Sequence, residues 1–376
     1  MRISDYLLSV LFLLTAVAGS VLGQGPYTVT DLGPGWAYAI NDLGQIAGCT
    51  SGQNATVYSG GIIQVLSGLP SCATSINNSG QVVGYYATTG VPPQGFLYSG
   101  GSLTNLPVGF SPTAINDLGQ IVGQGSNGDA FLCSNGSMQD LGTPPGGLSS
   151  GPKAINDSGQ VVGIAYMNSG YENAYLYSGG AMQSLGTLPG YTESQANAVN
   201  NDGQVVGVAY NGINDRAFIY SGDSMHDLGA LGGDYSDAWG INDNGLVIGQ
   251  AQTSGGNVDA FVYSDGVMQD LNNLIPFDPG WTLYEAYGIN DEGLIVGEGF
   301  NPSGQQDAYL LTPVPEPSTR ALLTAGAIIG LVGYGLRTRT VTRTAKPTAL
   351  DQQDDSSILS SFPSHSSPVN VVRRAA

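Results

Sequence analysis

Basic residues, histidine and cysteine are scarce in this chain of 376 residues. It has ten Lys and Arg against 29 Asp and Glu, with only two His and three Cys. Proteins that bind nucleic acid use Lys and Arg to neutralise phosphates, so this composition argues against a nucleic-acid partner. The two histidines, His226 and His365, are also too few for a zinc site built from imidazole groups.

The lack of positive charge is strongest in the middle of the chain. Residues 24–312 contain 24 acidic residues and only two basic ones, Lys153 and Arg216. A surface this acidic stays solvated, binds cations or meets neutral polymers. The same region has no amphipathic helical window of useful length, which argues against a helical fold.

A repeated motif fills this region instead. It consists of a small or β-branched residue, Asn, two turn residues, Gly, Gln or Leu, two aliphatic residues and a second Gly. The spacing of 36 to 48 residues between copies is typical of a four-stranded propeller blade rather than of a two-helix solenoid unit. The copies begin at Asn41, Asn77, Asn116, Asn156, Asn200, Asn242 and Asn290.

Each copy predicts four short strands. In the fourth copy we expect strands at residues 154–156, 161–166, 174–178 and 182–185. The Asn-Asp-Ser-Gly turn that starts at Asn156 suits the first hairpin, because Asn and Asp favour turn starts and Gly accepts a left-handed backbone.

The seventh copy ends one strand early. Its third strand, expected at residues 307–311, runs directly into Pro313. An isolated copy of the fourth-strand motif stands at residues 27–33, before the first repeat. We therefore predict an all-β fold, a seven-bladed β-propeller of four-stranded blades over residues 24–312. Its N-terminal strand closes the ring by pairing with the last blade.

Both ends of the chain are predicted to be targeting segments. Residues 1–23 contain Arg2, an apolar run and then small residues, as in a secretory signal peptide. Residues 321–336 are uncharged and bounded by arginines, which indicates a short transmembrane span with the propeller outside. Residues 347–376 are polar and are expected to be disordered.

A short motif precedes this hydrophobic segment. Pro315, Glu316 and Pro317 lie within Val-Pro-Glu-Pro-Ser-Thr, which is followed by Gly-rich apolar residues and then arginines. Over residues 313–346 this arrangement resembles the PEP-CTERM sorting signal of Gram-negative bacteria. The resemblance implies a protease partner of the exosortase class and a secreted component of the envelope, the surface or the exopolysaccharide matrix.

The repeat resembles the extracellular HAF repeat. The pattern is Ala-Ile-Asn-Asp-x-Gly-Gln-Val-Val-Gly, followed by Ala-Phe-Leu-Tyr-Ser-Gly-Gly and Met-Gln-Asp-Leu-Gly, and it covers nearly the whole mature chain. The resemblance implies a secreted β-rich repeat protein, and it adds location more than chemistry.

Two motifs of enzymes occur, and neither has the context that its chemistry needs. Residues 123–128 match the dinucleotide-binding pattern G-x-G-x-x-G, but we expect a strand rather than a helix after them. Residues 147–151 match G-x-S-x-G but fall in an expected inter-blade loop, without a strand-to-helix elbow. A Ser-His-Asp triad would have to use His226. We therefore predict that the chain is not an enzyme.

The Asn-Asp turns have two interpretations. Their oxygens and following Gly suit calcium, yet calcium takes six to eight oxygens and one turn offers few. In the alternative, Asn caps the turn and Asp is solvated. We expect the structural role and no cofactor, with calcium as the alternative.

Cysteine spacing allows one disulfide. Cys49 ends a second strand and Cys72 precedes the next blade, so the two could bridge in an oxidising compartment. Cys133 takes a position that Tyr holds in other blades and is expected to be a buried free thiol.

Loop length varies on only one face of the predicted propeller. The tight hairpin turns share one face, and the variable second-to-third and inter-blade loops share the other, which is often the binding face of repeat proteins. Aromatic rings beside amides and carboxylates suit sugar rings, although such rings also pack against blades. The ligand-face candidates are Trp36, Tyr85, Tyr86, Tyr171, Tyr191, Tyr235, Trp281 and Tyr284.

These patterns predict a secreted or cell-surface binding or structural protein, with extracellular polysaccharide as its expected partner. Two alternatives stay open. One is a purely structural surface protein without a ligand, and the other is an extracellular hydrolase that acts on polysaccharide.

Overall fold

The computed structural model describes residues 25–86 and 94–314. The predicted signal peptide, the sorting motif, the hydrophobic segment and the tail lie outside the described residues. The described secondary structure is β-strand, apart from one 3-10 helix, η1 (Leu271–Leu274). No helix in this part of the chain is long and apolar enough to cross a membrane.

Each repeat folds into antiparallel strands. The first strands are β2 (Gly35–Ile40), β6 (Ser71–Ile76), β10 (Ser111–Ile115), β14 (Gly147–Ile155), β18 (Glu193–Val199), β22 (Gly232–Ile241) and β26 (Thr282–Ile289). The second strands are β3 (Ile46–Thr50), β7 (Val82–Tyr86), β11 (Ile121–Gln124), β15 (Val161–Met167), β19 (Val205–Tyr210), β23 (Val247–Thr253) and β27 (Ile295–Phe300). The third strands are β4 (Ala55–Ser59), β8 (Gln94–Ser99), β12 (Ala130–Ser134), β16 (Glu172–Ser178), β20 (Asp215–Ser221), β24 (Val258–Ser264) and β28 (Gln306–Pro313). The fourth strands are β5 (Ile62–Val65), β9 (Ser102–Asn105), β13 (Ser137–Gly142), β17 (Ala181–Gly186), β21 (Ser224–Asp227), β25 (Val267–Asp270) and β1 (Tyr27–Gly33).

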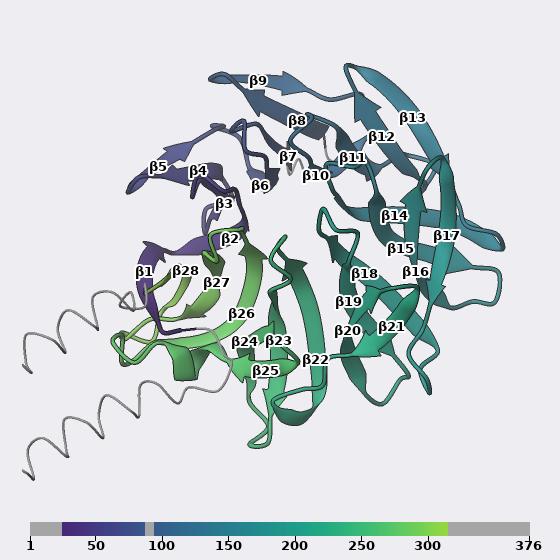
Figure 1. Ribbon diagram of the computed structural model, residues 1–376. Helices are drawn as coiled ribbons and strands as arrows, with labels where there is room; N and C mark the ends of the chain where they lie inside the picture. The colour runs from purple at the N-terminus through teal and green to yellow at the C-terminus, as the bar shows by residue number, and fades with distance from the viewer. Residues whose placement is uncertain (1–24, 87–93, 315–376) are drawn as a thin grey trace, which may run out of the picture. The chain divides into compact units, whose positions relative to one another are not determined.

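The strands pair in the order that the repeat predicts. The described residues form five four-stranded sheets and one eight-stranded sheet. The eight-stranded sheet consists of two four-stranded units that meet at a single parallel pair, Asp215 with Tyr235. Figure 1 shows the first strands toward the centre and the fourth strands at the outside. We call each four-stranded unit a blade and its first strand the inner strand, and the all-β propeller prediction is confirmed.

The N-terminal strand closes the last blade, as predicted. β1 pairs with β28 in an antiparallel register that runs from Tyr27 opposite Pro313 to Gly33 opposite Ala308. Tyr27 is fully buried in a core cluster with Leu311. The first and last parts of the described chain therefore share one sheet (Figure 1).

The hydrophobic core lies between neighbouring blades rather than within one. One cluster joins Val122 of β11 to Val161 and Tyr175 of the next blade. Another joins Ile46 of β3 to Val296 of β27, across the closure. Each strand carries small and aliphatic residues on both faces because it packs between two neighbours.

The two glycines of the motif are required for different physical reasons. The first has a left-handed backbone, with φ of 78° at Gly203, as the tight turn requires. The second allows strands to approach closely, since a Cβ at Gly207 would lie 1.9 Å from the carbonyl oxygen of Gln195. Equivalent contacts occur at Gly48, Gly84, Gly123, Gly163, Gly249 and Gly297.

We expected residues 147–151 to form an inter-blade loop, and this prediction is wrong. These residues begin β14, whose pairing with β15 extends out to Met167. Ser150 is fully buried, accepts a hydrogen bond from the Ala130 amide at 3.0 Å and donates one to the Gly142 carbonyl at 2.7 Å. The G-x-S-x-G motif is thus part of an inner strand, and the side chain of its second serine joins this strand to the preceding blade.

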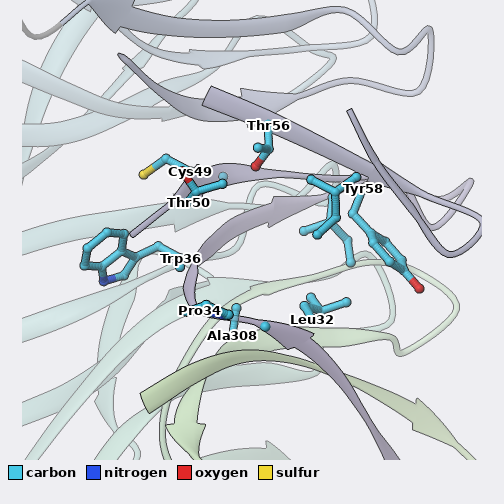
Figure 2. A pocket seen from close by; sticks show the side chains of 13 residues that line it. Leu32, Pro34, Trp36, Cys49, Thr50, Thr56, Tyr58 and Ala308 are labelled. Carbon is cyan, nitrogen blue, oxygen red and sulfur yellow. The ribbon is translucent and has the colours of Figure 1, made fainter. Parts of the chain in front are cut away.

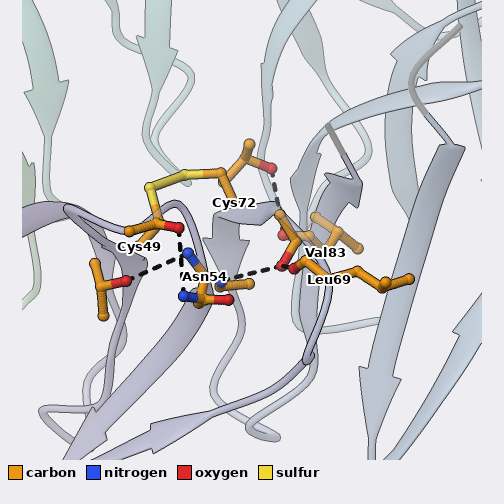
Figure 3. The surroundings of a disulfide bond; sticks show 10 residues. Cys49, Asn54, Leu69, Cys72 and Val83 are labelled. Atoms are coloured by element: carbon orange, nitrogen blue, oxygen red, sulfur yellow. Dashed lines mark hydrogen bonds between the residues drawn. A yellow bond between two sulfur atoms is a disulfide. The ribbon is translucent and has the colours of Figure 1, made fainter. Parts of the chain in front are cut away.

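The disulfide that the cysteine spacing allows is present. Cys49 of β3 and Cys72 of β6 are bonded, with their Cα atoms 5.1 Å apart, and they link the first two blades (Figure 3). Cys133 is a buried free cysteine, as predicted.

Candidate functional site

The seven inner strands end in a closed ring of buried asparagines. Each motif Asn donates its side-chain amide to the backbone carbonyl of the next motif Asn. The ring runs from Asn41 to Asn77 at 2.9 Å and closes from Asn290 back to Asn41 at 2.9 Å. The side-chain oxygen of Asn41 also accepts the amide of Gln45 at 2.8 Å. The motif Asn therefore caps its own turn and joins two blades.

The residue after each motif Asn forms a second ring. The Asp42 amide donates to Oδ1 of Asn78 at 2.8 Å, and the Asp291 amide donates to Oδ1 of Asp42 at 3.0 Å. Asp42 is exposed to solvent, as expected, and its carboxylate also accepts a hydrogen bond from the adjacent blade. The ring consists of Asp42, Asn78, Asp117, Asp157, Asn201, Asp243 and Asp291.

Both rings surround one hollow of about 220 Å³. Its wall contains the motif Asn and the residue that follows from every blade, and the preceding aliphatic residue from six of the seven blades. Within residues 25–86 and 94–314, no group of three or more His, Cys, Asp or Glu is placed to hold a metal ion. Calcium at these turns stays a prediction. At this end of the inner strands the polar groups form hydrogen bonds with one another, and these bonds hold the blades together.

Each inner strand also carries a β-bulge, three residues before its motif Asn. In β2 the pairing with β3 skips from Ala37 to Ala39, which leaves Tyr38 as the extra residue. Bulges turn a side chain away from its regular direction and recur beside functional sites. The seven bulge residues are Tyr38, Thr74, Thr113, Lys153, Asn197, Trp239 and Tyr287.

The bulge residues differ from blade to blade, while their neighbours do not. The residue before the bulge is Ala or Pro in every copy, and the residue after it is Ala, Ser or Gly. A structural requirement common to all blades would be met by similar residues in every copy, as it is at the motif Asn. The bulge position is therefore free of a structural requirement common to all blades, and its residues are available for binding. This variation is present in the sequence, and our sequence analysis missed it.

Three bulge residues on consecutive blades form an aromatic arc, which consists of Trp239, Tyr287 and Tyr38. The rings of Trp239 and Tyr287 are stacked, with centroids 4.7 Å apart and planes at 19°. Tyr38 meets Tyr287 edge-on, with centroids 5.5 Å apart. The arc crosses the closure of the ring, because Tyr287 lies on β26 and Tyr38 on β2.

Two glutamates lie beside this arc. Glu285 of β26 and Glu298 of β27 are directly opposite in register. The Tyr287 hydroxyl donates to Glu285 and lies 3.3 Å from Oε2 of Glu298. Glu298 is only 4% exposed, and burial raises its pKa. Among the described residues the ion pairs involve Arg216 alone, with Asp227 and Asp234, so these glutamates have no cationic partner.

A third carboxyl group, Asp237, lies on β22 two residues before Trp239. It accepts a hydrogen bond from the Asn197 side chain at 3.0 Å. Burial raises the pKa of Asp237 to about 7, assisted by Asp215 and opposed by Trp239, Lys153 and Asn197. The group is therefore poised between its neutral and charged forms near neutral pH.

Two of the eight aromatic candidates, Tyr235 and Tyr284, lie near these carboxyl groups, and a third, Tyr85, lies near Tyr38. The Tyr235 hydroxyl accepts from the Gln250 side chain, and the Asp237 carboxylate helps burial to raise the pKa of Tyr235. Burial and then Glu298 raise the pKa of Tyr284. Burial, and then neighbouring Tyr85 and the two glutamates, raise the pKa of Tyr38 to about 12.

The other candidates lie elsewhere. Trp36 lines a pocket of about 40 Å³ with Leu32 and Tyr58 (Figure 2), which has space for only a few water molecules. Tyr86 packs on Phe96, with ring centroids 5.2 Å apart. Tyr171 is exposed.

The remaining two candidates pack against core clusters. Tyr191 is partly buried against one cluster, and Trp281 against another, where it meets Tyr309 edge-on at 6.5 Å. Trp281, expected on the ligand face, therefore helps to cover the core of the last blade. The inter-blade stretch before β26 folds back through η1 and covers the last blade's core.

The one described histidine lies away from the arc. His226 contacts Ser224 at 2.8 Å on β21, the outermost strand of its blade, and both side chains are exposed. No carboxylate partner of His226 is recorded among the described residues. A Ser-His-Asp constellation is therefore not assembled there.

No protein family model matches the chain, and no curated protein matches it. Among solved structures, YCF48 bound to a D1 peptide is 15% identical, with 79% of this chain and 99% of that chain covered, at a TM-score of 0.48. The β-propeller domain of the Trilobed protease from Pyrococcus furiosus is 12% identical, with 76% and 95% covered, at 0.47. A gluconolactonase from Xanthomonas campestris is 12% identical, with 78% and 99% covered, at 0.40. Likenesses at this level say nothing of activity.

Proposed function

We propose that the chain is an exported β-propeller that binds extracellular polysaccharide at its bulge residues and is sorted to the cell envelope. The observation that carries this proposal is the ring of bulges, which varies from blade to blade within a constant frame. Three bulge residues supply aromatic faces, and Asn197, Thr74 and Thr113 supply amide and hydroxyl groups. Aromatic faces beside such groups suit the apolar faces and hydroxyls of sugar rings.

Export and sorting are supported by the two ends of the sequence and by the disulfide. A disulfide between Cys49 and Cys72 is favoured in an oxidising compartment. The segment with Pro315, Glu316 and Pro317 has the order of a sorting signal, namely motif, apolar run and arginines. We therefore propose an exosortase-type protease as the processing partner and a Gram-negative cell envelope or its extracellular matrix as the destination.

The proposed role is binding without turnover. The test is a pull-down of native exopolysaccharide by the exported protein, followed by an assay of new reducing ends in the bound polymer. Retention with no increase in reducing ends is the expected result. A steady increase would favour the polysaccharide hydrolase, and no retention would favour a purely structural surface protein.

Sorting is tested separately in the native host. Changing Pro315, Glu316 and Pro317 to Ala should leave an unprocessed form in the membrane fraction, because the protease would lose its recognition motif. Electrophoretic size and surface release of the variant are compared with those of the unchanged protein. If both are the same, the sorting proposal is wrong.

A further inference from the structure

We infer that the glycan bound at the bulge residues carries protonated amino groups, as a chain of free glucosamine units does. This inference rests on the proposed polysaccharide-binding function and specifies its ligand. Three observations support it: the sign of the charge beside the aromatic arc, the aromatic faces themselves, and a half-buried carboxyl group that can exchange a proton for a cation.

The charge beside the aromatic arc is negative and not neutralised by the protein. Asp237, Glu285 and Glu298 all lie within or next to the strands that carry the arc. A uronic-acid polymer would bring like charge to these carboxyl groups, and a neutral polymer would leave them with hydrogen-bond donors of the protein but no cationic partner. An ammonium group supplies the missing positive charge and donates charge-assisted hydrogen bonds.

Lys153 is the one basic bulge residue. It lies on β14, in the fourth blade, whereas the arc lies on the sixth, seventh and first blades. Its charge acts on Asp237, whose pKa it lowers. One lysine against three carboxyl groups leaves the site negative, and its removal should favour a cationic ligand.

The aromatic arc adds a second attraction for cations. The faces of Trp and Tyr rings carry partial negative charge and hold ammonium groups, most strongly when water is excluded. Trp239 and Tyr287 are stacked, and Tyr38 stands edge-on to Tyr287, so the rings are packed in place before a ligand arrives. A glucosamine unit can place its apolar ring face on such a surface while its amino group reaches a carboxylate.

Binding of a cation should also release a proton. Burial keeps Asp237 partly protonated near neutral pH, and the charged or titratable groups around it are Lys153, Asp215, Tyr210 and Tyr235. An ammonium ligand stabilises the ionised carboxylate, so the proton leaves as the ligand binds. Up to about one proton per site should be released, and none is expected for a neutral glycan.

The test compares two matched ligands. Titration calorimetry of the exported protein uses the β-1,4-linked tetramer of glucosamine and the tetramer of N-acetylglucosamine, at about pH 6.5 and in two buffers of different ionisation enthalpy. The amine tetramer should bind about tenfold more tightly or better, which corresponds to one charge-assisted hydrogen bond. Its apparent enthalpy should differ between the buffers because protons are released.

Three variants locate the effect. Glu298→Gln keeps the shape of the side chain and removes its charge, so it should cost the amine tetramer about tenfold in affinity. Lys153→Met removes a positive charge that acts on Asp237 and should raise the affinity for the amine tetramer. Asp42→Asn removes a carboxylate from the ring that follows the motif Asn, where Asn78 and Asn201 already occur in other blades, and should change nothing. Melting temperatures show whether each variant is folded.

Several outcomes overturn the inference. Equal affinity for the two tetramers, or preference for the acetylated one, would mean that a glycan binds but its amino group is not recognised, and the proposed function would survive. Weaker binding after Lys153→Met would point to an acidic glycan instead. If neither tetramer binds and native polysaccharide is not retained either, the proposed function itself fails.

Discussion

Single residues explain why the motif contains the amino acids that it does. Both polar groups of the motif Asn side chain form hydrogen bonds. Its oxygen caps the turn, and its amide donates to the next blade. In the second blade, Asn77 receives the amide of Asn41 and donates its own to Asn116, each at 2.9 Å. Such buried polar groups are costly to leave unpaired, so one residue type recurs in every copy.

The second Gly of the motif should tolerate no side chain. In Gly207→Ala the new Cβ would meet the Gln195 carbonyl oxygen, and the strands would have to separate. We expect a loss of about 1–3 kcal/mol or more in the free energy of unfolding, as for other overpacked sites. Urea unfolding measures it, with Gly68→Ala as the control, because a Cβ there would meet no atom within 4 Å. Equal stability of the two variants would show that the contact is easily relaxed.

The fold was predictable at the level of the elements because each element has a local signal. Turn residues marked the hairpins, and the missing fourth strand of the last repeat, together with the isolated segment at residues 27–33, revealed the closure. The extension of β14 back to Gly147 was not predictable in the same way. Its Gly, Ser and Pro residues are typical of a loop, and they form a strand because β15 continues alongside.

Removal of β1 tests the closure directly. Without residues 27–33, β28 loses its outer neighbour and the core loses the buried ring of Tyr27. We expect a lower melting temperature and self-association, because an open apolar edge pairs with other chains. Thermal unfolding and light scattering follow the two effects. A monomer with the melting temperature of the full ring would contradict the closure.

The candidate site could be predicted only in part. Tyr85, Tyr235 and Tyr284 were chosen because aromatic residues on long loops suit ligands. Tyr235 and Tyr284 do lie near the carboxyl groups, and Tyr85 lies near Tyr38 of the arc. Tyr38, Trp239 and the others of the bulge ring were missed, because a bulge arises from pairing with the second strand and has no turn residue to mark it. A comparison of the seven copies with one another could have found the bulge residues, because this position varies while its neighbours do not.

At the scale of the whole molecule, negative charge is abundant and cations are rare. Burial raises the pKa of carboxyl groups in the propeller, as it does at Asp237 and Glu298. A raised pKa means that the folded state holds the proton more tightly than the unfolded chain. The resulting stabilisation is present below the unfolded pKa of about 4 and is lost as the pH rises through the folded value.

The melting temperature should therefore fall as the pH rises from about 4.5 to 7.5. In Asp237→Asn the side chain can no longer ionise, so the fall should be smaller than in the unchanged protein, whose Asp237 has a pKa of about 7. Thermal unfolding across this pH range measures both slopes. Parallel curves for the two proteins would mean that Asp237 ionises without cost in the folded state.

The most direct test separates two neighbouring positions at the same end of one inner strand. Trp239 and Asn242 both lie at the end of β22, three residues apart, one in the bulge ring and the other in the asparagine ring. Trp239→Thr introduces the bulge residue of the second and third blades, and Asn242→Ala removes a bond to the next blade. Melting temperature and polysaccharide affinity are measured for both. We predict that Trp239→Thr lowers affinity about tenfold with little change in melting, since a stacking face is lost. Asn242→Ala should lower the melting temperature and leave binding per folded molecule unchanged. Unchanged affinity in Trp239→Thr, or a selective binding loss in Asn242→Ala, would contradict the assignment of binding to the bulges.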